Sequence, residues 1–128
     1  MIVDDSGTNL FLLQRLLEDE GYSVIITEDP REGLEYVDKH SSINLILLDI
    51  MMPKLDGFEF MKRLSDSGRL SDIPVVIVTA RDDKQSQQKA MHMGAKDYIT
   101  KPLDINKVVE TIHQQLRCWL NRAELRQK

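Results

Sequence analysis

Two short runs of sequence decide the fold, Leu45-Ile46-Leu47-Leu48-Asp49 and Val75-Val76-Ile77-Val78-Thr79. Each is a row of four apolar residues that ends in a polar one. A strand covered on one face alternates apolar and polar residues, whereas a run that is apolar throughout is typical of a strand buried on both faces. We therefore expect these runs to be central strands of a parallel sheet with helices on both sides.

Shorter strands and intervening helices complete the expected fold. Residues 1–3, 22–26 and 97–100 are expected as the remaining strands, and the segments between strands carry apolar residues at helical spacing. Asp29-Pro30 is typical of a helix N-cap followed by proline at the first helical position. This alternation predicts an α/β fold, a doubly wound five-stranded parallel sheet flanked by five helices. It is the flavodoxin-like (βα)5 arrangement, here with an extended C-terminal helix.

Size and composition exclude several classes of protein. The chain has 128 residues, enough for one domain, and its single cysteine, Cys118, excludes a disulfide scaffold and a cysteine-rich metal site. The longest apolar runs have four residues, far short of the roughly 20 needed to cross a bilayer. The first residues lack the basic and apolar regions of a signal peptide. We expect a soluble, cytoplasmic protein with no membrane partner.

Charge is unevenly distributed along the chain. The net charge is −4, but residues 116–128 carry +3 and residues 1–115 carry −7. Binding to a phosphate backbone needs clustered Lys and Arg, so an acidic body argues against direct nucleic-acid binding by this domain. The excess of carboxylates is compatible with a cation site.

Polar residues close four of the five expected strands. Asp4-Asp5 follow the first strand, Asp49 the third, Thr79 the fourth and Lys101-Pro102 the fifth. Taken singly, each has a plain structural explanation, because Asp often caps a helix and Thr suits a strand. Parallel topology, however, brings all of them to the same edge of the sheet, where ligands bind in such folds.

Three carboxylates at one edge predict a cation. At about 5 Å and an effective dielectric constant near 20, each pair of carboxylates repels by about 3 kcal/mol. Oxygen ligands without nearby His or Cys favour Mg²⁺ over zinc. A carboxylate nucleophile, a metal, the Thr79 hydroxyl and the Lys101 ammonium together are typical of a site that handles phosphoryl groups.

Several motifs in order resemble a known family. Asp4-Asp5, residues 47–57, Thr79-Ala80 and residues 94–102 are similar to the response-regulator receiver domain of two-component signal transduction, which has a CheY-like fold. The resemblance runs from the first residues to about His113. It implies a phosphorylation-controlled switch, not a turnover enzyme, that takes its phosphoryl group from a sensor histidine kinase or a phosphotransfer protein.

The resemblance also implies roles for individual residues. Asp49 would accept the phosphoryl group. Asp5, Asp49 and the Met51 backbone carbonyl would bind Mg²⁺ directly, with Asp4 acting through water, and Mn²⁺ could substitute. Phosphorylation of Asp49 would change the conformation of the domain, and this change would control an output domain or a partner.

The remaining implied roles concern the phosphoryl group and the switch. Thr79 and Lys101 would contact the phosphoryl oxygens, and the peptide bond before Pro102 is expected to be cis, an isomer that is inexpensive only before proline. Tyr98 would turn inward as Thr79 moves toward the phosphoryl group.

Two positions are expected to set the lifetime of the phosphorylated form. Met51 and Arg81 match positions that border the path of the hydrolytic water in the family. Because an apolar Met51 side chain cannot orient water, we expect self-dephosphorylation to take minutes or longer, while Arg81 could hold a water or cover the phosphoryl group.

The last helix is expected to extend from Asp104 to about Arg126, longer than a sheet-covering helix needs. We divide the chain into a receiver domain, residues 1–115, and a linker, residues 116–128, toward an output module beyond Lys128.

The last helix also carries apolar residues at a 3-4-3-4 spacing. This apolar stripe would allow a homodimer, or it would simply face the core of the domain, with the helix fraying beyond Leu116. The stripe consists of Val109, Ile112, Leu116, Trp119 and Ala123. The short segment before Asp4 and the unfinished stripe suggest a piece of a longer signalling chain.

Two other functions fit parts of the pattern. A Mg²⁺-dependent phosphatase of the haloacid-dehalogenase type also uses an aspartyl nucleophile, but it places a second Asp where Met51 stands. A flavodoxin-like small-molecule binder would need phosphate donors in its first loop, where Asp4 and Asp5 instead repel a phosphate.

Overall fold

The computed structural model describes residues 1–40, 42–51 and 56–127, and for residues 118–127 the course of the helix without the side chains. Five parallel strands form one sheet in the order β2-β1-β3-β4-β5. The strands are β1 (Ile2–Val3), β2 (Ile26–Thr27), β3 (Ile46–Leu48), β4 (Val75–Thr79) and β5 (Asp97–Thr100). The predicted five-stranded parallel sheet is therefore confirmed.

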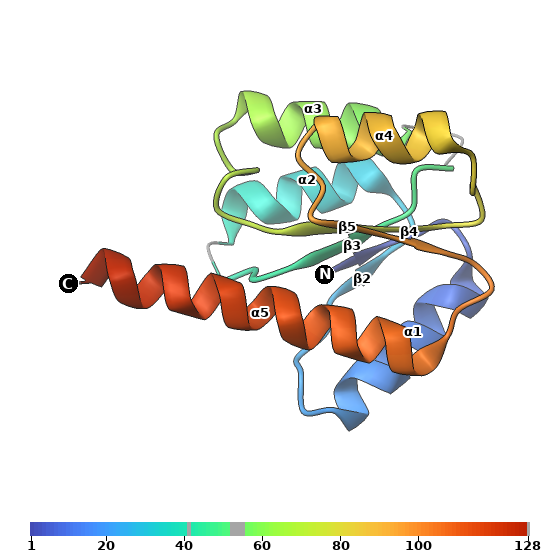
Figure 1. Cartoon of the computed structure of the whole chain (residues 1–128), viewed down its shortest axis with the longest axis horizontal. Coiled ribbons are helices and arrows are strands. Elements are labelled where there is room, and N and C mark those ends of the chain that lie inside the picture. The colour runs from blue at the N-terminus through green and yellow to red at the C-terminus, as the bar shows by residue number, and fades with distance from the viewer. Residues whose placement is uncertain (41, 52–55, 128) are drawn as a thin grey trace.

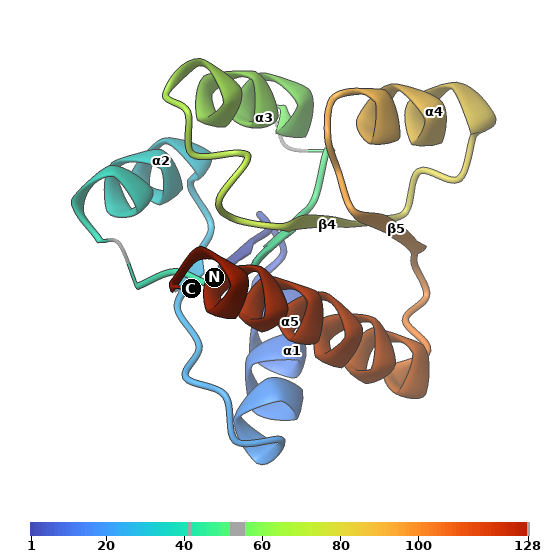
Figure 2. The same ribbon diagram turned by 60° about the vertical axis from the view of Figure 1, so that its left-hand side comes forward.

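Five helices alternate with the strands and cover both faces of the sheet (Figures 1 and 2). They are α1 (Gly7–Asp19), α2 (Pro30–Lys39), α3 (Gly57–Asp66), α4 (Lys84–His92) and α5 (Ile105–Gln127). In both views α1 and α5 lie on one side of the sheet and α2, α3 and α4 on the other. None of the helices in the described part of the chain is long and apolar enough to cross a membrane.

The unbroken apolar runs are explained by a separate core on each face of the sheet. Successive side chains of a strand point to opposite faces. In β4, Val75 and Ile77 pack in the core under α2, α3 and α4, whereas Val76 and Val78 pack in the core under α1 and α5. All four are buried, so both faces of the strand are covered along this run.

Side-chain caps fix where the helices begin. The carboxylate of Asp29 accepts from the Arg31 N–H at 2.9 Å, and Pro30 is the first residue of α2, as predicted. Asp56 caps α3, Asp83 caps α4 and Asp104 caps α5.

The second strand is the main correction to the expected elements. Residues 22–26 were expected as a strand, but β2 comprises only Ile26–Thr27. Because β2 pairs only with β1, and the register sets Ile2 opposite Ile26, residues 22–24 lie beyond the paired stretch. Tyr22, Ser23 and Val24 instead line the cavity described below.

The apolar stripe of the last helix is partly used by the domain's own core. Ile112 is 2% exposed, and Leu116 packs partly buried against the same core as α1. The neighbouring Val108 is fully buried, whereas Val109 is only half-buried, so Val108 takes the place of Val109 in the core while Ile112 and Leu116 face the core as the stripe predicts. The side chains of Trp119 and Ala123 lie outside the described residues.

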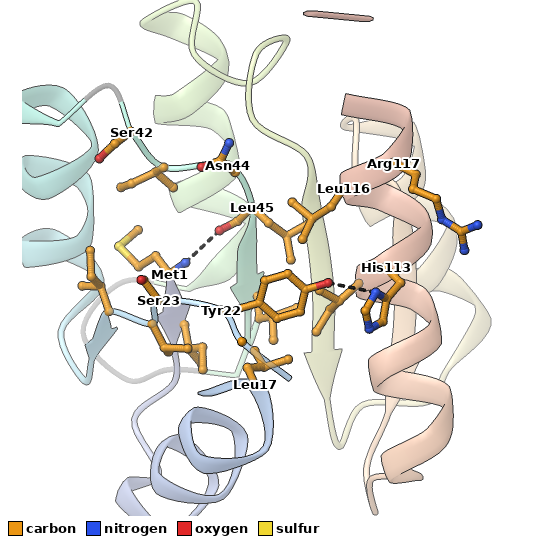
Figure 3. A pocket seen from close by; sticks show the side chains of 17 residues that line it. Met1, Leu17, Tyr22, Ser23, Ser42, Asn44, Leu45, His113, Leu116 and Arg117 are labelled. Atoms are coloured by element: carbon orange, nitrogen blue, oxygen red, sulfur yellow. Dashed lines mark hydrogen bonds between the residues drawn. The ribbon is translucent and has the colours of Figure 1, made fainter. Parts of the chain in front are cut away.

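A cavity lies at the amino ends of β1, β2 and β3, opposite the polar strand ends. Its volume is about 770 Å³, and residues from the starts of these strands, from the end of α1 and from α5 line it. Figure 3 shows the Tyr22 hydroxyl at its rim, 3.0 Å from Nδ1 of His113 on α5. The same histidine lies 3.6 Å from the carboxylate of Glu20. This cluster ties α5 to the turn after α1.

Candidate functional site

The strand order brings the predicted site residues to one edge of the sheet. β1, β3, β4 and β5 are successive neighbours in the sheet. Asp4 and Asp5 follow β1, Asp49 follows β3, Thr79 ends β4 and Lys101 follows β5. All five strands run in the same direction, so these residues meet at the carboxyl edge, as the sequence predicted.

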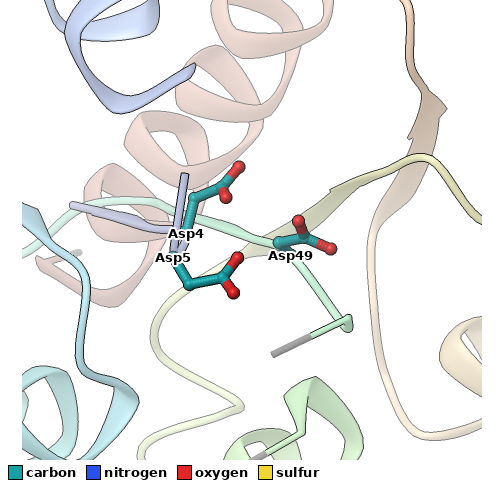
Figure 4. Close-up of side chains that lie close together, drawn as sticks. All are labelled: Asp4, Asp5 and Asp49. Atoms are coloured by element: carbon teal, nitrogen blue, oxygen red, sulfur yellow. The ribbon is translucent and has the colours of Figure 1, made fainter. Parts of the chain in front are cut away.

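Three carboxylates form a compact acidic cluster (Figure 4). One oxygen from each of Asp4, Asp5 and Asp49 lies within 4.8 Å of the other two. Asp4 and Asp49 are buried, with exposed fractions of 2% and 6%, whereas Asp5 is exposed. The cluster is therefore open to solvent on the side of Asp5 and enclosed on the side of the other two.

The Lys101 ammonium group bridges the two buried carboxylates. Its Nζ lies 2.9 Å from Oδ2 of Asp4 and 3.0 Å from Oδ2 of Asp49. Burial alone would lower the pKa of Lys101, but the hydrogen bonds to both carboxylates outweigh burial and raise this pKa. Lys101 is thus held as a cation and offsets part of the repulsion between Asp4 and Asp49.

Asp4 remains under electrostatic strain despite this partner. Burial raises the pKa of its carboxyl group, and the charge of Asp49 acts in the same direction. The hydrogen bonds from Lys101 and from the Ser6 N–H, the latter at 2.9 Å, offset only part of that effect. A second cation at the cluster would relieve the remaining unfavourable charge.

Asp49 is positioned by the chain that follows it. Its Oδ1 accepts from the Met51 N–H at 2.9 Å. Gly57, the first residue of α3, approaches this segment so closely that a Cβ there would lie 2.6 Å from Cα of Ile50 and 2.9 Å from the Asp49 carbonyl oxygen. In the sequence, Gly57 is one residue of a matching motif. No local signal marks its close approach, because Gly7 also directly follows an N-cap, Ser6, and a Cβ there would meet only the Glu28 side chain.

Thr79 and Tyr98 are connected through the backbone of Arg81. Thr79 is fully buried, and its hydroxyl oxygen accepts from the Arg81 N–H at 3.4 Å. The hydroxyl of Tyr98 donates to the Arg81 carbonyl at 2.6 Å, and the Tyr98 side chain is 7% exposed. Burial raises the pKa of Tyr98, so its hydroxyl is retained as a donor. The tyrosine side chain lies inward.

The other predicted positions surround this centre. Met51 is half exposed, and Arg81 extends from the loop that follows β4. The peptide bond between Lys101 and Pro102 is cis. The Lys101 N–H also donates to the Thr79 carbonyl at 2.7 Å, which joins the end of β5 to the end of β4.

The donor set fits a hard divalent cation. The cluster offers carboxylate oxygens only, and Mg²⁺ prefers one or two carboxylates together with water and phosphate oxygens. Asp5 supplies an exposed carboxylate on the open side, where water and a phosphoryl group can enter. Asp4, Asp5 and Asp49 are the residues that would hold such an ion.

Comparisons with known proteins agree with this geometry. The family model of the response regulator receiver domain matches residues 1–113. Protein PilH of Pseudomonas aeruginosa is 35% identical over 116 residues, 91% of this chain and 95% of PilH. The uncharacterized transcriptional regulatory protein YkoG of Bacillus subtilis is 38% identical over 117 residues, which are 91% of this chain and 50% of YkoG.

A solved structure shows the same architecture. A CheY-like response regulator receiver domain protein from Methanospirillum hungatei matches with a TM-score of 0.87 at 28% identity, over 94% of each chain. The polar residues at the carboxyl edge are those on which the resemblance in the sequence rests. With a family model that spans most of its length and a relative of similar size, this chain belongs to the response regulator receiver domain family.

Proposed function

We propose that this domain is a phosphorylation-controlled switch in which Asp49 accepts a phosphoryl group from a sensor histidine kinase or a phosphotransfer protein. The observation that carries the proposal is the setting of Asp49, with two carboxylates within 4.8 Å and the Lys101 ammonium at 3.0 Å. Receiver-family membership supports this assignment.

The chemistry is a transfer between two nucleophiles. A carboxylate oxygen of Asp49 attacks the phosphorus of a phosphohistidine on the donor. The new O–P bond forms as the P–N bond breaks, and the electron pair of that bond leaves with the histidine nitrogen. Lys101 offsets the negative charge that gathers on the phosphoryl oxygens, and the Thr79 hydroxyl is the nearby donor at the end of β4.

A divalent cation completes the proposed site. When bound, Mg²⁺ neutralises charge on the carboxylates and the phosphoryl oxygens, and Mn²⁺ can replace it. Asp5 and Asp49 would hold the ion together with the Met51 backbone carbonyl, while Asp4 would contribute through water. The setting of the three carboxylates supports this, because an oxygen of each lies within 4.8 Å of the other two, and burial together with the charge of Asp49 raises the pKa of Asp4.

The output is a change of conformation rather than turnover of a substrate. An acyl phosphate at Asp49 adds charge beside Thr79 and Lys101, and a few kcal/mol of differential interaction are enough to shift a two-state equilibrium. The bond from the Tyr98 hydroxyl to the Arg81 carbonyl supports its role as the switch residue, because it links this side chain to the loop that follows Thr79. The domain would act in the cytoplasm on a partner or an output domain. Such an output region is consistent with YkoG, half of which lies outside the match.

Phosphorylation by acetyl phosphate with Mg²⁺ tests the proposal directly. The intact mass of the unaltered chain is expected to increase by one phosphoryl group. Asp49→Asn should abolish this gain, whereas Asp56→Asn, which keeps the cap of α3, should retain it. Labelling that persists in Asp49→Asn would contradict the assignment.

A further inference from the structure

The loop between β4 and α4 contains contacts of Arg81 that link the end of β4 to Tyr98 and to the start of α4. Four residues, 80–83, join the end of β4 to the start of α4. Within them, the backbone of Arg81 bonds to Thr79 on one side and to Tyr98 on the other, at 3.4 and 2.6 Å. The Arg81 peptide groups therefore cannot move without changing the bonds of both residues.

The side chain of Arg81 extends this chain of contacts to α4. Its Nε lies 3.3 Å from Oδ1 of Asp83. The other carboxylate oxygen of Asp83, Oδ2, accepts from the Ser86 N–H at 2.9 Å and caps α4. Ser86 is buried, so the first turn of the helix is packed against the body of the domain. Asp83 thus uses one oxygen for the loop and the other for the helix.

The charge of Asp83 is maintained by its surroundings. The hydrogen bonds from Ser86 lower the pKa of the Asp83 carboxyl group, and Arg81 acts in the same direction. Burial raises the pKa of Tyr98, and the negative charge of Asp83 acts in the same direction. The loop, the tyrosine and the start of α4 consequently form one connected unit.

We propose that Arg81 and Asp83 form a positioning pair, the contact through which a displacement of Thr79 and the Arg81 peptide is carried to the first turn of α4. This inference rests on the proposed function, because phosphorylation of Asp49 supplies the displacement. It adds to that function by naming the side chains that link the phosphoryl site to a helix on the surface. Both side chains are about half exposed, so the contact can reorganise without unfolding the loop.

The size of the effect follows from this exposure. Exposed ion pairs change equilibria by about one-and-a-half-fold to fivefold. That is too little to hold the fold together but enough to alter how strongly the first turn of α4 responds to the site. Loss of the pair in Asp83→Asn should therefore weaken the coupling and leave the groups around Asp49 unchanged.

Two variants separate the ion pair from the helix cap. Asp83→Asn keeps a good N-cap residue but removes the charge. Arg81→Gln removes the guanidinium and leaves the backbone bonds to Thr79 and Tyr98 available. Arg81→Lys, which keeps a cation, is the conservative variant expected to restore part of the coupling.

The chain also offers a matched control. Arg31 Nε lies 3.3 Å from Oδ1 of Asp29, the N-cap of α2, so this pair has the same contact at the start of another helix. Because α2 is connected to β2 and not to β4, Arg31→Gln removes a similar ion pair that is not linked to Thr79.

The experiment is hydrogen exchange of backbone amides in the full chain, with and without beryllofluoride and Mg²⁺ as an acyl-phosphate mimic. In the unaltered chain, beryllofluoride should change exchange both at Tyr98 and at residues 84–87. In Arg81→Gln and Asp83→Asn, the change at Tyr98 should persist, while the change at residues 84–87 falls about one-and-a-half-fold to fivefold. Arg31→Gln should behave like the unaltered chain, and Arg81→Lys should lie between.

The outcomes are distinguishable. An undiminished response of residues 84–87 in both Arg81→Gln and Asp83→Asn would overturn the positioning pair alone. An equal loss in Arg31→Gln would also overturn it, because the effect would then be a general result of removing charge. If beryllofluoride changes nothing in the unaltered chain, the proposed function fails, and this inference fails with it.

Discussion

Asp4 is a single residue whose negative charge the fold makes unfavourable. Its carboxyl group is buried next to Asp49, and burial raises its pKa despite the bonds from Lys101 and Ser6. Ionised Asp4 is therefore less favourable in the folded chain than in the unfolded one. Such unfavourable charge is common at sites built to bind a cation.

Replacement of Asp4 should stabilise the protein in a pH-dependent way. Well below pH 3.8, the ordinary pKa of this carboxyl group, Asp4 is neutral in both states and has no electrostatic effect. Between that pKa and the higher pKa of the folded state, stability falls as the pH rises, and above the folded pKa the whole loss is present. Asp4→Asn should therefore raise the melting temperature at pH 7 by about 2–6 °C, and this gain should disappear in acid.

The measurement is thermal unfolding from pH 3 to pH 7 without divalent cations. Asp66→Asn, at the exposed end of α3, serves as the control and should change the melting temperature by less than about 2 °C. A lower melting temperature for Asp4→Asn at pH 7 would show that its bond to Lys101 outweighs its burial.

At the scale of elements, the position of the start of α3 depends on Gly57, which has no side chain to keep it away from Ile50. Gly57→Ala would place a Cβ 2.6 Å from Cα of Ile50, and backbone at that distance must shift. We expect a loss of about 1–3 kcal/mol in the free energy of unfolding, together with slower phosphorylation of Asp49. Urea unfolding and the acetyl phosphate reaction measure the two effects.

Gly7→Ala is the matched control because Gly7 also begins a helix, α1. Its added Cβ would meet only the end of the flexible Glu28 side chain, at 3.2 Å. The free energy of unfolding should change by less than about 1 kcal/mol. Equal effects of the two substitutions would mean that close approach to Asp49 is not the reason for Gly57.

The attachment of α5 gives a second prediction at this scale. Tyr22 bonds to His113 across 91 residues of sequence, at the rim of the cavity under α5. Tyr22→Phe removes the hydroxyl and keeps the ring, and it should lower stability by about 0.5–1.5 kcal/mol. Exchange of the backbone amides around His113 should accelerate correspondingly.

Tyr36→Phe is the control for the loss of a tyrosine hydroxyl. Tyr36 lies on α2, with its ring stacked on that of His40 at 3.9 Å, on the other side of the sheet from α5. Exchange in α5 should be unchanged in this variant. Unchanged exchange in Tyr22→Phe as well would show that apolar packing alone fixes α5.

At the scale of the whole molecule, the fold places the proposed chemistry and the cavity at opposite edges of the sheet. The acidic cluster lies at the carboxyl edge of the sheet, whereas the cavity and the bond from Tyr22 to His113 lie at the amino edge. In Figure 1, α5 passes along the sheet and continues beyond it at the amino edge. One helix thus connects both edges.

Metal binding should be visible in the stability of the entire domain. A ligand that binds only the folded state stabilises it by about 2.7 kcal/mol at 100 times its Kd. At that concentration we expect Mg²⁺ to raise the free energy of unfolding by about 2.7 kcal/mol, and a chelator should reverse this gain. Asp5→Asn should lose most of it, whereas Asp19→Asn, at the end of α1, should keep it. An equal response in both variants would place the ion elsewhere.

The sequence determined the architecture because its strongest signals are local. The unbroken runs at residues 45–48 and 75–78 required two buried faces, and strand–helix alternation then required a parallel sheet. Caps such as Asp29-Pro30 acted over a few residues and could be located without knowing the fold. Parallel direction alone predicted that the polar strand ends would meet.

The tertiary structure decided what depends on register and on contacts distant in sequence. The length of β2 was set by its pairing with β1, and the first residue of α5 to enter the core is Val108 instead of the predicted Val109. The bridge from Lys101 to Asp4 spans 97 residues, and no local pattern contains it. Composition and spacing specify which groups reach the edge of the sheet, but only packing from all sides specifies distance, burial and charge at each atom.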